Sequence, residues 1–202
     1  EQYRLDRVAR VCARVADNLA EQMRQGKVEK SYFEEEFRRG RIFDPIELTI
    51  DNHKVFIEGK IDRVDVFEGG DMRVIDYKTG GDKVNIEQMR CGYKMQLMVY
   101  MQGAKSDDRR PVGVFYYNIK DLSVQMGNDG DVADTVSNEM NKGMALNGLC
   151  VDEAHILDEM PESMLGVKKF IISRATFESI EADVSRSIYD ISKRIISGDV
   201  SI

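Results

Sequence analysis

Two runs of sequence decide the fold of this chain: VFIEGKIDRVDV at residues 55–66 and RVIDYK at residues 73–78. Both runs are rich in apolar residues, and Glu68-Gly69-Gly70-Asp71 between them contains a turn signal, so the pattern predicts two strands joined by a tight connection. Because side chains two apart in a strand point to the same face, Asp76 and Lys78 share a face of this hairpin. Asp62, on the neighbouring strand, can meet them if the strand register allows.

Two carboxylates and one ammonium group at the end of an apolar hairpin are not needed for packing. They suit a divalent metal ion, which carboxylates and water hold and which lowers the pKa of bound water. On this interpretation Asp62 and Asp76 supply metal ligands, the Tyr77 carbonyl adds another, and Lys78 orients the attacking water and stabilises developing negative charge. The alternative is an exposed Asp76–Lys78 strand pair with a salt bridge between Asp62 and Arg63, and for an isolated D-x-K this alternative is the better one.

The composition is that of a soluble globular domain. The chain has 202 residues, of which 42% are apolar and 32% charged, enough for one domain with a real core. No apolar run is long enough to span a membrane, and no segment resembles a secretory signal. The net charge of −7 argues against a domain that grips nucleic acid mainly through a basic face, but it does not exclude a nuclease.

Cysteine and histidine usage narrows the kinds of metal site. Cys12, Cys91 and Cys150 are widely scattered and lack metal-type spacing, so we interpret them as thiols in a reducing cytosol. His53 and His155 are the two histidines, which excludes a histidine-rich metal site.

Apolar spacing predicts the elements of the first half of the chain. Between residues 3 and 25, apolar residues recur every three or four positions, which predicts one face of an amphipathic helix that ends at Gly26. An extended segment or short strand follows at 31–40. The alternating run 45–50 and the turn at 51–52 lead back into the strand at 55–66, so 45–50, 55–66 and 73–78 are expected to form three successive antiparallel strands.

A second set of elements completes the expected fold. Asn85 caps a helix that continues to about Gly103, and a buried strand follows at 112–117. A weak helical pattern at 131–148 and an irregular segment at 151–167 come next. The chain then forms a short strand at 170–172 and a helix from Thr176 to Gly198. This order predicts an α/β protein with one mixed sheet and helices on its faces. Gln96 and Tyr100 share one side of the expected 85–103 helix; they either are incidental polar groups or point at the Asp62/Asp76 cluster, and periodicity does not decide between these readings.

The longer pattern has a recognisable family resemblance. The runs GKIDRVD at 59–65, VIDYKTG at 74–80 and QLMVY at 96–100 resemble the GxIDRxD, IDYKTG and QLxxY motifs of the PD-(D/E)xK nuclease superfamily, in its RecB-like branch. Weaker likeness at 34–37, 45–46, 116–119 and 195–199 extends to the C-terminal nuclease region of AddB-type helicase/nuclease subunits. The resemblance covers most of the chain and depends on the combination of motifs, since no single motif is specific.

The resemblance implies a fold and a function. The fold is a restriction-endonuclease-like central mixed β-sheet flanked by α-helices, forming a single nuclease domain over residues 1–202, with 128–170 a loop-rich excursion. The implied activity is Mg²⁺-dependent exonuclease cleavage of single-stranded DNA, with Mn²⁺ as an alternative ion, in bacterial double-strand-break repair. Asp62 and Asp76 match the metal ligands, Lys78 the catalytic lysine, and Gln96 and Tyr100 the motif behind the site. The implied partner is a helicase/nuclease A subunit, in the bacterial cytoplasm, without a membrane.

Two features of the family are missing from this sequence. The family carries a further metal ligand, often His, on an upstream helix, and AddB-type domains hold an iron–sulfur cluster that we expect only in a longer parent chain, of which these residues are a fragment. The three cysteines do not have the spacing of the cluster ligands. Two other functions stay open: a non-catalytic DNA-binding or scaffold module on a nuclease fold, and a stand-alone nuclease of the CRISPR-adaptation type.

Overall fold

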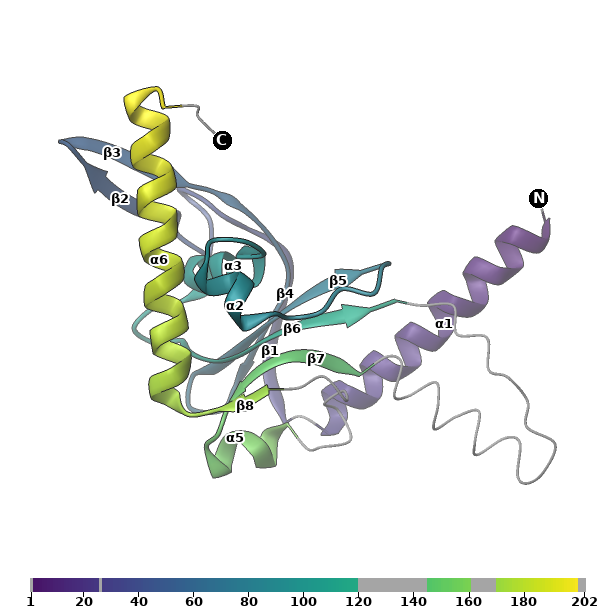
Figure 1. Cartoon of the computed structure of the whole chain (residues 1–202). Coiled ribbons are helices and arrows are strands. Elements are labelled where there is room, and N and C mark those ends of the chain that lie inside the picture. Colours follow the sequence, from purple (N-terminus) through teal and green to yellow (C-terminus); the bar gives the residue numbers. More distant parts are fainter. Residues whose placement is uncertain (1, 26, 120–144, 161–169, 200–202) are drawn as a thin grey trace.

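The computed structural model describes residues 2–25, 27–119, 145–160 and 170–199 (Figure 1). In chain order the elements are α1 (Gln2–Gln25), β1 (Val28–Phe37), β2 (Ile46–Ile50), β3 (His53–Ile57), β4 (Gly59–Phe67), β5 (Asp71–Lys78), α2 (Ile86–Arg90), α3 (Gln96–Ala104), β6 (Arg110–Asn118), β7 (Leu146–Val151), α5 (Ala154–Glu159), β8 (Phe170–Ile172) and α6 (Arg174–Ser197). Within these ranges, no helix is long and apolar enough to cross a membrane.

The described strands form a six-stranded sheet in the order β1-β4-β5-β6-β7-β8, and β2 and β3 form a separate hairpin. The pairs β1–β4, β4–β5 and β6–β7 are antiparallel, whereas β5–β6 and β7–β8 are parallel. The sheet is therefore mixed, and the predicted α/β fold with helices around a central mixed sheet is confirmed.

Two apolar cores lie on the two faces of this sheet. On one face, strand side chains such as Val64, Val74 and Val114 pack with α2, α3 and α6. On the other face, Ile75 and Phe115 pack with α5 and with the second half of α1. Because β6 is covered on both faces, its residues 112–117 form a nearly continuous apolar run, as predicted.

The β4–β5 hairpin is confirmed. β4 ends at Phe67 and β5 begins at Asp71, and the Gly70 N–H donates to the Phe67 carbonyl at 3.1 Å. Gly69 and Gly70 both have φ of +87°, a conformation that residues with a Cβ rarely adopt. The Gly-Gly pair therefore sets this turn and, with it, the hairpin register.

The prediction that 45–50, 55–66 and 73–78 form one antiparallel sheet is wrong in its first strand. The segment 55–66 is divided at Glu58, so β2 pairs with β3 outside the main sheet. The neighbour of β4 is β1, paired with it from Val28↔Phe67 to Phe37↔Gly59. The physical reason is that the ten-residue β1 occupies the whole outer edge of β4. The β2–β3 hairpin therefore stays outside this sheet and packs through Ile46, Leu48 and Ile57 against the core that contains α2, α3 and α6.

The prediction of one helix from Asn85 to Gly103 is also wrong. Asn85 does cap α2, since its Oδ1 accepts from the Gln88 N–H at 2.9 Å, but α2 ends at Arg90 and α3 starts at Gln96. Between them Gly92 and Lys94 take φ values of +82° and +45°, which end a right-handed helix. The apolar periodicity crosses the break because both helices face the same core.

Four smaller differences concern the second half of the chain. Residues 146–148, predicted as helix, belong to β7, while 131–144 lie outside the described residues. The segment 151–167 contains α5, and its residues 161–167 again lie outside the described part. The last helix, predicted to start at Thr176, starts at Arg174, because Ser173 caps α6 and its Oγ accepts from the Thr176 N–H at 3.2 Å. Of the predicted 128–170 excursion, the described part holds β7 and α5.

Candidate active site

The candidate site lies where β4 and β5 separate. Their ladder ends at the pair Arg63↔Ile75, although β4 stays paired with β1 as far as Gly59. One further step in register would bring Asp62 opposite Asp76, on the same face of the sheet. Instead, the Tyr77 N–H donates to the Asp62 carboxylate at 2.8 Å. The side chain of Asp62 thus replaces a backbone partner and opens a fork between the strands, with both aspartates at it.

Asp76 and Lys78 form an ion pair at this fork. Lys78 Nζ lies 2.7 Å from Asp76 Oδ2, and the Asp76 side chain is only 3% exposed. Burial raises the Asp76 pKa, and the charges of Asp62 and Asp82 add to the increase, while Lys78 only partly offsets it. Burial alone would lower the Lys78 pKa, but the hydrogen bond and charge of Asp76 outweigh it and raise this pKa. Lys78 is therefore held as an ammonium group.

Gln96 and Tyr100 extend this ion pair. Lys78 Nζ donates to Gln96 Oε1 at 2.8 Å, and Gln96 Nε2 donates to the Tyr100 hydroxyl at 2.8 Å. The break before α3 makes Gln96 the first helical residue, so its side chain begins directly over the end of β5. The structure thus brings Gln96 to Lys78 and places Tyr100 behind Gln96, on the side of the candidate cluster; the roles of both residues remain predictions.

Three further residues at the fork had no predicted role. The Tyr116 ring lies 5.7 Å from Lys78 Nζ, and burial, followed by the charges of Asp76 and Asp82, raises its pKa to about 12. Asn118 Nδ2 donates to the Asp82 carbonyl at 3.2 Å and so ties the segment after β5 to the end of β6. Tyr116 and Asn118 lie at the fork because β6 pairs with β5 in the parallel register Asp76↔Tyr116 and Lys78↔Asn118. Tyr116 and Asn118 are two residues apart and so share a face of β6. With the pairing of β6 and β5 known, this spacing would have identified both as residues of the site.

The donor set fits a magnesium ion. Within the described ranges, no group of three or more His, Cys, Asp or Glu side chains is arranged to hold a metal. Mg²⁺, however, is commonly bound through one or two carboxylates, with water and substrate phosphate completing its shell. Asp62 and Asp76 can supply those carboxylates, and a cation would offset the burial and repulsion that oppose ionisation of Asp76. The Tyr77 carbonyl remains a predicted additional ligand.

The opposite face of the same strand pair carries a buried ion network. Arg63, Asp65 and Arg73 are all fully buried. Asp65 accepts from Arg63 Nε and Nη2 at 2.7 and 2.8 Å, and from Arg73 Nε at 2.8 Å. Burial would raise the Asp65 pKa, but the charges of Arg73 and Arg63 lower it overall. Arg63 therefore pairs with Asp65, whereas the sequence-based alternative had paired it with Asp62.

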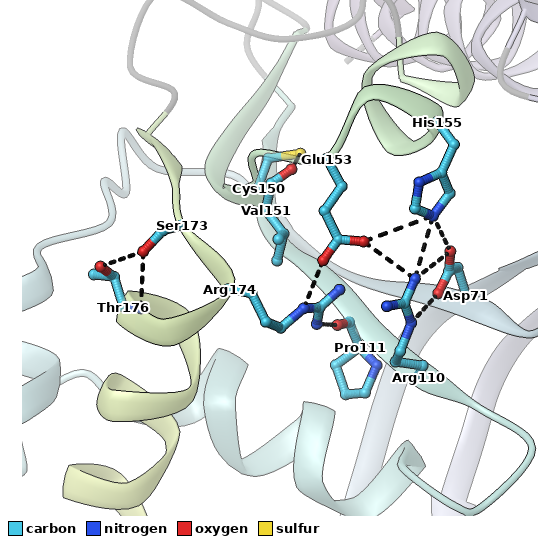
Figure 2. Close-up of polar contacts among 10 residues, drawn as sticks. All are labelled: Asp71, Arg110, Pro111, Cys150, Val151, Glu153, His155, Ser173, Arg174 and Thr176. Carbon is cyan, nitrogen blue, oxygen red and sulfur yellow. Dashed lines mark hydrogen bonds and ion pairs between the residues drawn. The ribbon is translucent and has the colours of Figure 1, made fainter.

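A second polar cluster lies at the other end of the sheet, where β5 and β6 begin (Figure 2). Arg110 Nε donates to Asp71 Oδ1 at 2.6 Å, and His155 Nε2 lies 3.0 Å from Asp71 Oδ2. Glu153 accepts from Arg110 at 3.2 Å and from Arg174 at 2.8 Å. The cluster thus links β5 and β6 to α5 and the start of α6. A cavity of about 390 Å³ lies beside this cluster. The basic side chains that line it, Lys105, Arg110 and Arg174, already form ion pairs with acidic residues of the protein. We therefore assign the cluster a structural role.

Comparisons with known proteins agree with this geometry. A family model described as the PD-(D/E)XK nuclease superfamily matches residues 1–198. Proteins named as the B subunit of an ATP-dependent helicase/deoxyribonuclease are similar over most or all of the chain. The one from Thermoanaerobacter sp. (strain X514) is 28% identical, covering 100% of this chain and 20% of its own length. The one from Clostridioides difficile (strain 630) is 26% identical, with 91% and 18% covered. The chain spans about a fifth of the length of these relatives.

Proposed function

Because this chain belongs to the PD-(D/E)XK nuclease superfamily, we propose that it hydrolyses phosphodiester bonds of DNA at the fork between β4 and β5. The observation that carries the proposal is the convergence of Asp62, Asp76 and Lys78 there. Two carboxylates and an ammonium group from adjacent strands, with Gln96 bonded to the ammonium, are what metal-dependent phosphodiester cleavage requires of a protein.

The residues have distinct roles in this proposal. Asp62 and Asp76 hold Mg²⁺, with the Tyr77 carbonyl as a further ligand. The bound ion supplies an activated water and neutralises charge on the phosphate oxygens. Lys78 stays protonated beside Asp76, and its ammonium group faces the developing negative charge. Gln96, itself held by Tyr100, restricts Lys78 to one position, and this restriction preserves the alignment that catalysis needs.

The biological setting is also a proposal. The relatives' printed names, together with the fifth of their length that this chain spans, support a nuclease domain, residues 1–202, within a longer helicase/nuclease chain. In that setting a helicase partner subunit delivers single-stranded DNA, and the domain degrades it as an exonuclease during double-strand-break repair. The iron–sulfur cluster would belong to the longer chain. Of the cysteines here, Cys12 and Cys91 are exposed and Cys150 is buried, and none of the three forms a disulfide.

Digestion of end-labelled single-stranded DNA by the 202-residue chain tests the proposal. We expect cleavage that needs Mg²⁺ or Mn²⁺, stops with EDTA, and falls at least about 100-fold in Asp76→Asn, since a lost metal ligand removes several kcal/mol of transition-state stabilisation. Asp190→Asn, on the exposed side of α6, is the matched control and should cleave normally.

Comparing linear with circular single strands separates exonuclease from endonuclease action, since circles have no ends. DNA binding without cleavage under every metal condition would instead favour the non-catalytic scaffold module. Cleavage without any link to a helicase in the parent gene would favour the CRISPR-adaptation type.

A further inference from the structure

The first half of α1 carries an aromatic residue and three arginines in one line. Tyr3, Arg7, Arg10 and Arg14 are spaced by four, three and four residues, which places them on one side of a helix. Tyr3 is 71% exposed, Arg7 and Arg10 are exposed, and Arg14 is half-buried. We call this set the α1 arginine face.

This face continues the line along which α1 touches the sheet. Asn18, four residues beyond Arg14, accepts a hydrogen bond from the Tyr117 hydroxyl at 3.0 Å. Tyr117 lies near the end of β6 and pairs with Tyr77 of β5, the residue between Asp76 and Lys78. At 1.5 Å per residue, Arg14 lies about 6 Å and Arg7 about 16 Å further along the helix axis than Asn18. Figure 1 shows the first half of α1 extending beyond the arrowhead of β6. The fork lies at this end of the sheet, because the parallel strands β5 and β6 both finish here, but Asp76 and Lys78 point to the other face, which α3 covers.

Charge is segregated along α1. Residues 2–14 contain four arginines and a single acid, Asp6, whereas the following residues add Asp17 and Glu21. Asp6 accepts from Gln2 at 3.0 Å, and Glu21 pairs with Arg24 at 2.6 Å. A chain with a net charge of −7 thus concentrates positive charge on a helix that projects past its candidate active site. A phosphate backbone is the partner whose charge complements this face.

We propose that the α1 arginine face binds the backbone of the single-stranded DNA whose end is hydrolysed at the β4–β5 fork. The inference rests on the proposed nuclease function and adds to it the surface that receives the strand. The guanidinium groups form charge-assisted hydrogen bonds with successive phosphates. Tyr3, at the outer end, stacks on a base, a contact that tolerates any sequence.

Equilibrium binding of a fluorescent 20-nucleotide single strand in EDTA, between 50 and 200 mM salt, tests the inference without cleavage. Each phosphate contact on a single strand contributes about 0.7 to the slope of log affinity against log salt. The triple substitution Arg7→Gln, Arg10→Gln and Arg14→Gln should therefore lower this slope by about 2. Over that fourfold range of salt, the unmodified chain should then lose about 20-fold more affinity than the triple variant.

A matched control removes the same charge from α6. Arg186→Gln, Lys193→Gln and Arg194→Gln change exposed side chains and should leave the slope unchanged. Equal losses in both triple variants would show that only net charge matters and would overturn the inference, as would an unchanged slope in the α1 variant. If the α1 triple variant does not fold, the exposed Arg10→Gln alone should lower the slope by about 0.7, and no change there would equally refute the inference.

Two further substitutions separate this inference from the proposed function. Tyr3→Ala should weaken binding about fivefold or more with an unchanged salt slope, as expected for a stacking contact; unchanged affinity would remove Tyr3 from the surface and contradict the proposal. Asp76→Asn should lose cleavage but keep the full slope. If Asp76→Asn still cleaves, the proposed function fails whatever the α1 variants do; if only the α1 variants behave like the unmodified chain, this inference alone fails.

Discussion

Asp62 and Asp65 lie three residues apart in β4, on opposite faces of the sheet, and the same substitution at each should have opposite consequences. Asp62 accepts from the Tyr77 N–H at the open fork. Asp65 is fully buried between two fully buried arginines. We expect Asp65→Asn to destabilise the fold, and Asp62→Asn to lower cleavage strongly while leaving the fold intact.

The size of the Asp65 effect follows from its contacts. Its carboxylate receives two hydrogen bonds from Arg63, at least one from Arg73, and one from Ser31 at 2.7 Å. Asparagine loses the charge and one acceptor oxygen, so two buried guanidinium groups remain without a counter-charge. Removing one partner of a buried ion pair costs about 3–5 kcal/mol. For a chain of this size, that corresponds to a melting temperature roughly 10 °C lower.

Asp62→Asn should have only a small effect on stability, because it keeps the local hydrogen bond. An asparagine there can still accept the Tyr77 N–H, and it removes a negative charge beside the buried Asp76. The free energy of unfolding should therefore change by less than about 1 kcal/mol, whereas cleavage should fall at least about 100-fold because a proposed metal ligand is lost.

Urea unfolding followed by circular dichroism, run beside the cleavage assay, measures both effects. The reasoning is refuted if Asp65→Asn is as stable as the unmodified chain, or if Asp62→Asn unfolds as readily as Asp65→Asn.

Two other predictions use the ends of β5. Gln96→Leu should lower the turnover rate about 10–100-fold without changing the Mg²⁺ concentration for half-maximal activity, because it releases Lys78 but touches no proposed ligand; a shifted metal dependence would contradict this. At the start of β5, burial would raise the Asp71 pKa, but hydrogen bonds from Arg110 and His155 lower it overall. Because the Asp71 pKa is lower in the folded chain, its carboxylate stabilises the fold at any pH above the unfolded pKa of about 3.9. This contribution is lost as the pH falls through the pKa of the folded chain. Asp71→Asn should therefore cost about 1–3 kcal/mol at pH 7 and flatten the loss of stability below pH 4, as measured by urea unfolding across pH; an unchanged acid limb would rule this out.

The sequence predicts the hairpin at the centre of the fold because local chemistry sets it. The Gly-Gly turn and the apolar runs on each side depend on neighbouring residues alone, so a hairpin within 55–66 and 73–78 was predicted without knowledge of the rest, although the division at Glu58 was not. The same alternation put Asp76 and Lys78 on one face. The fork itself was not foreseen, because it depends on Asp62 replacing a backbone partner of Tyr77.

Long-range pairing accounts for the strands that were misplaced. Residues 45–50 alternate as a half-buried strand whichever neighbour they have, so alternation could not reveal that β1 occupies the edge of β4. In the same way, 146–148 contain Leu, Asn and Gly, which have no strong strand preference, and they become a strand only beside β6.

The break between α2 and α3 shows a second limit of prediction from apolar spacing. Both helices pack on one core, so apolar spacing continues through the two left-handed residues, Gly92 and Lys94. Gln96 was placed correctly beside Tyr100 because both lie within α3. That Gln96 begins the helix, and therefore reaches Lys78, depends on backbone angles that residue spacing does not report.

The parallel pairing of β5 with β6 has a consequence for how the protein acquires activity. Between these strands the chain must first run through α2 and α3, so their contacts join residues distant in sequence, a kind of pairing that forms slowly. Asp76 and Lys78 lie on the first of these strands and Gln96 on the crossover. If the β4–β5 hairpin forms before β5 pairs with β6, its aspartates are in place before the site around them is enclosed, and we expect the proposed cleavage activity to appear only after that later pairing.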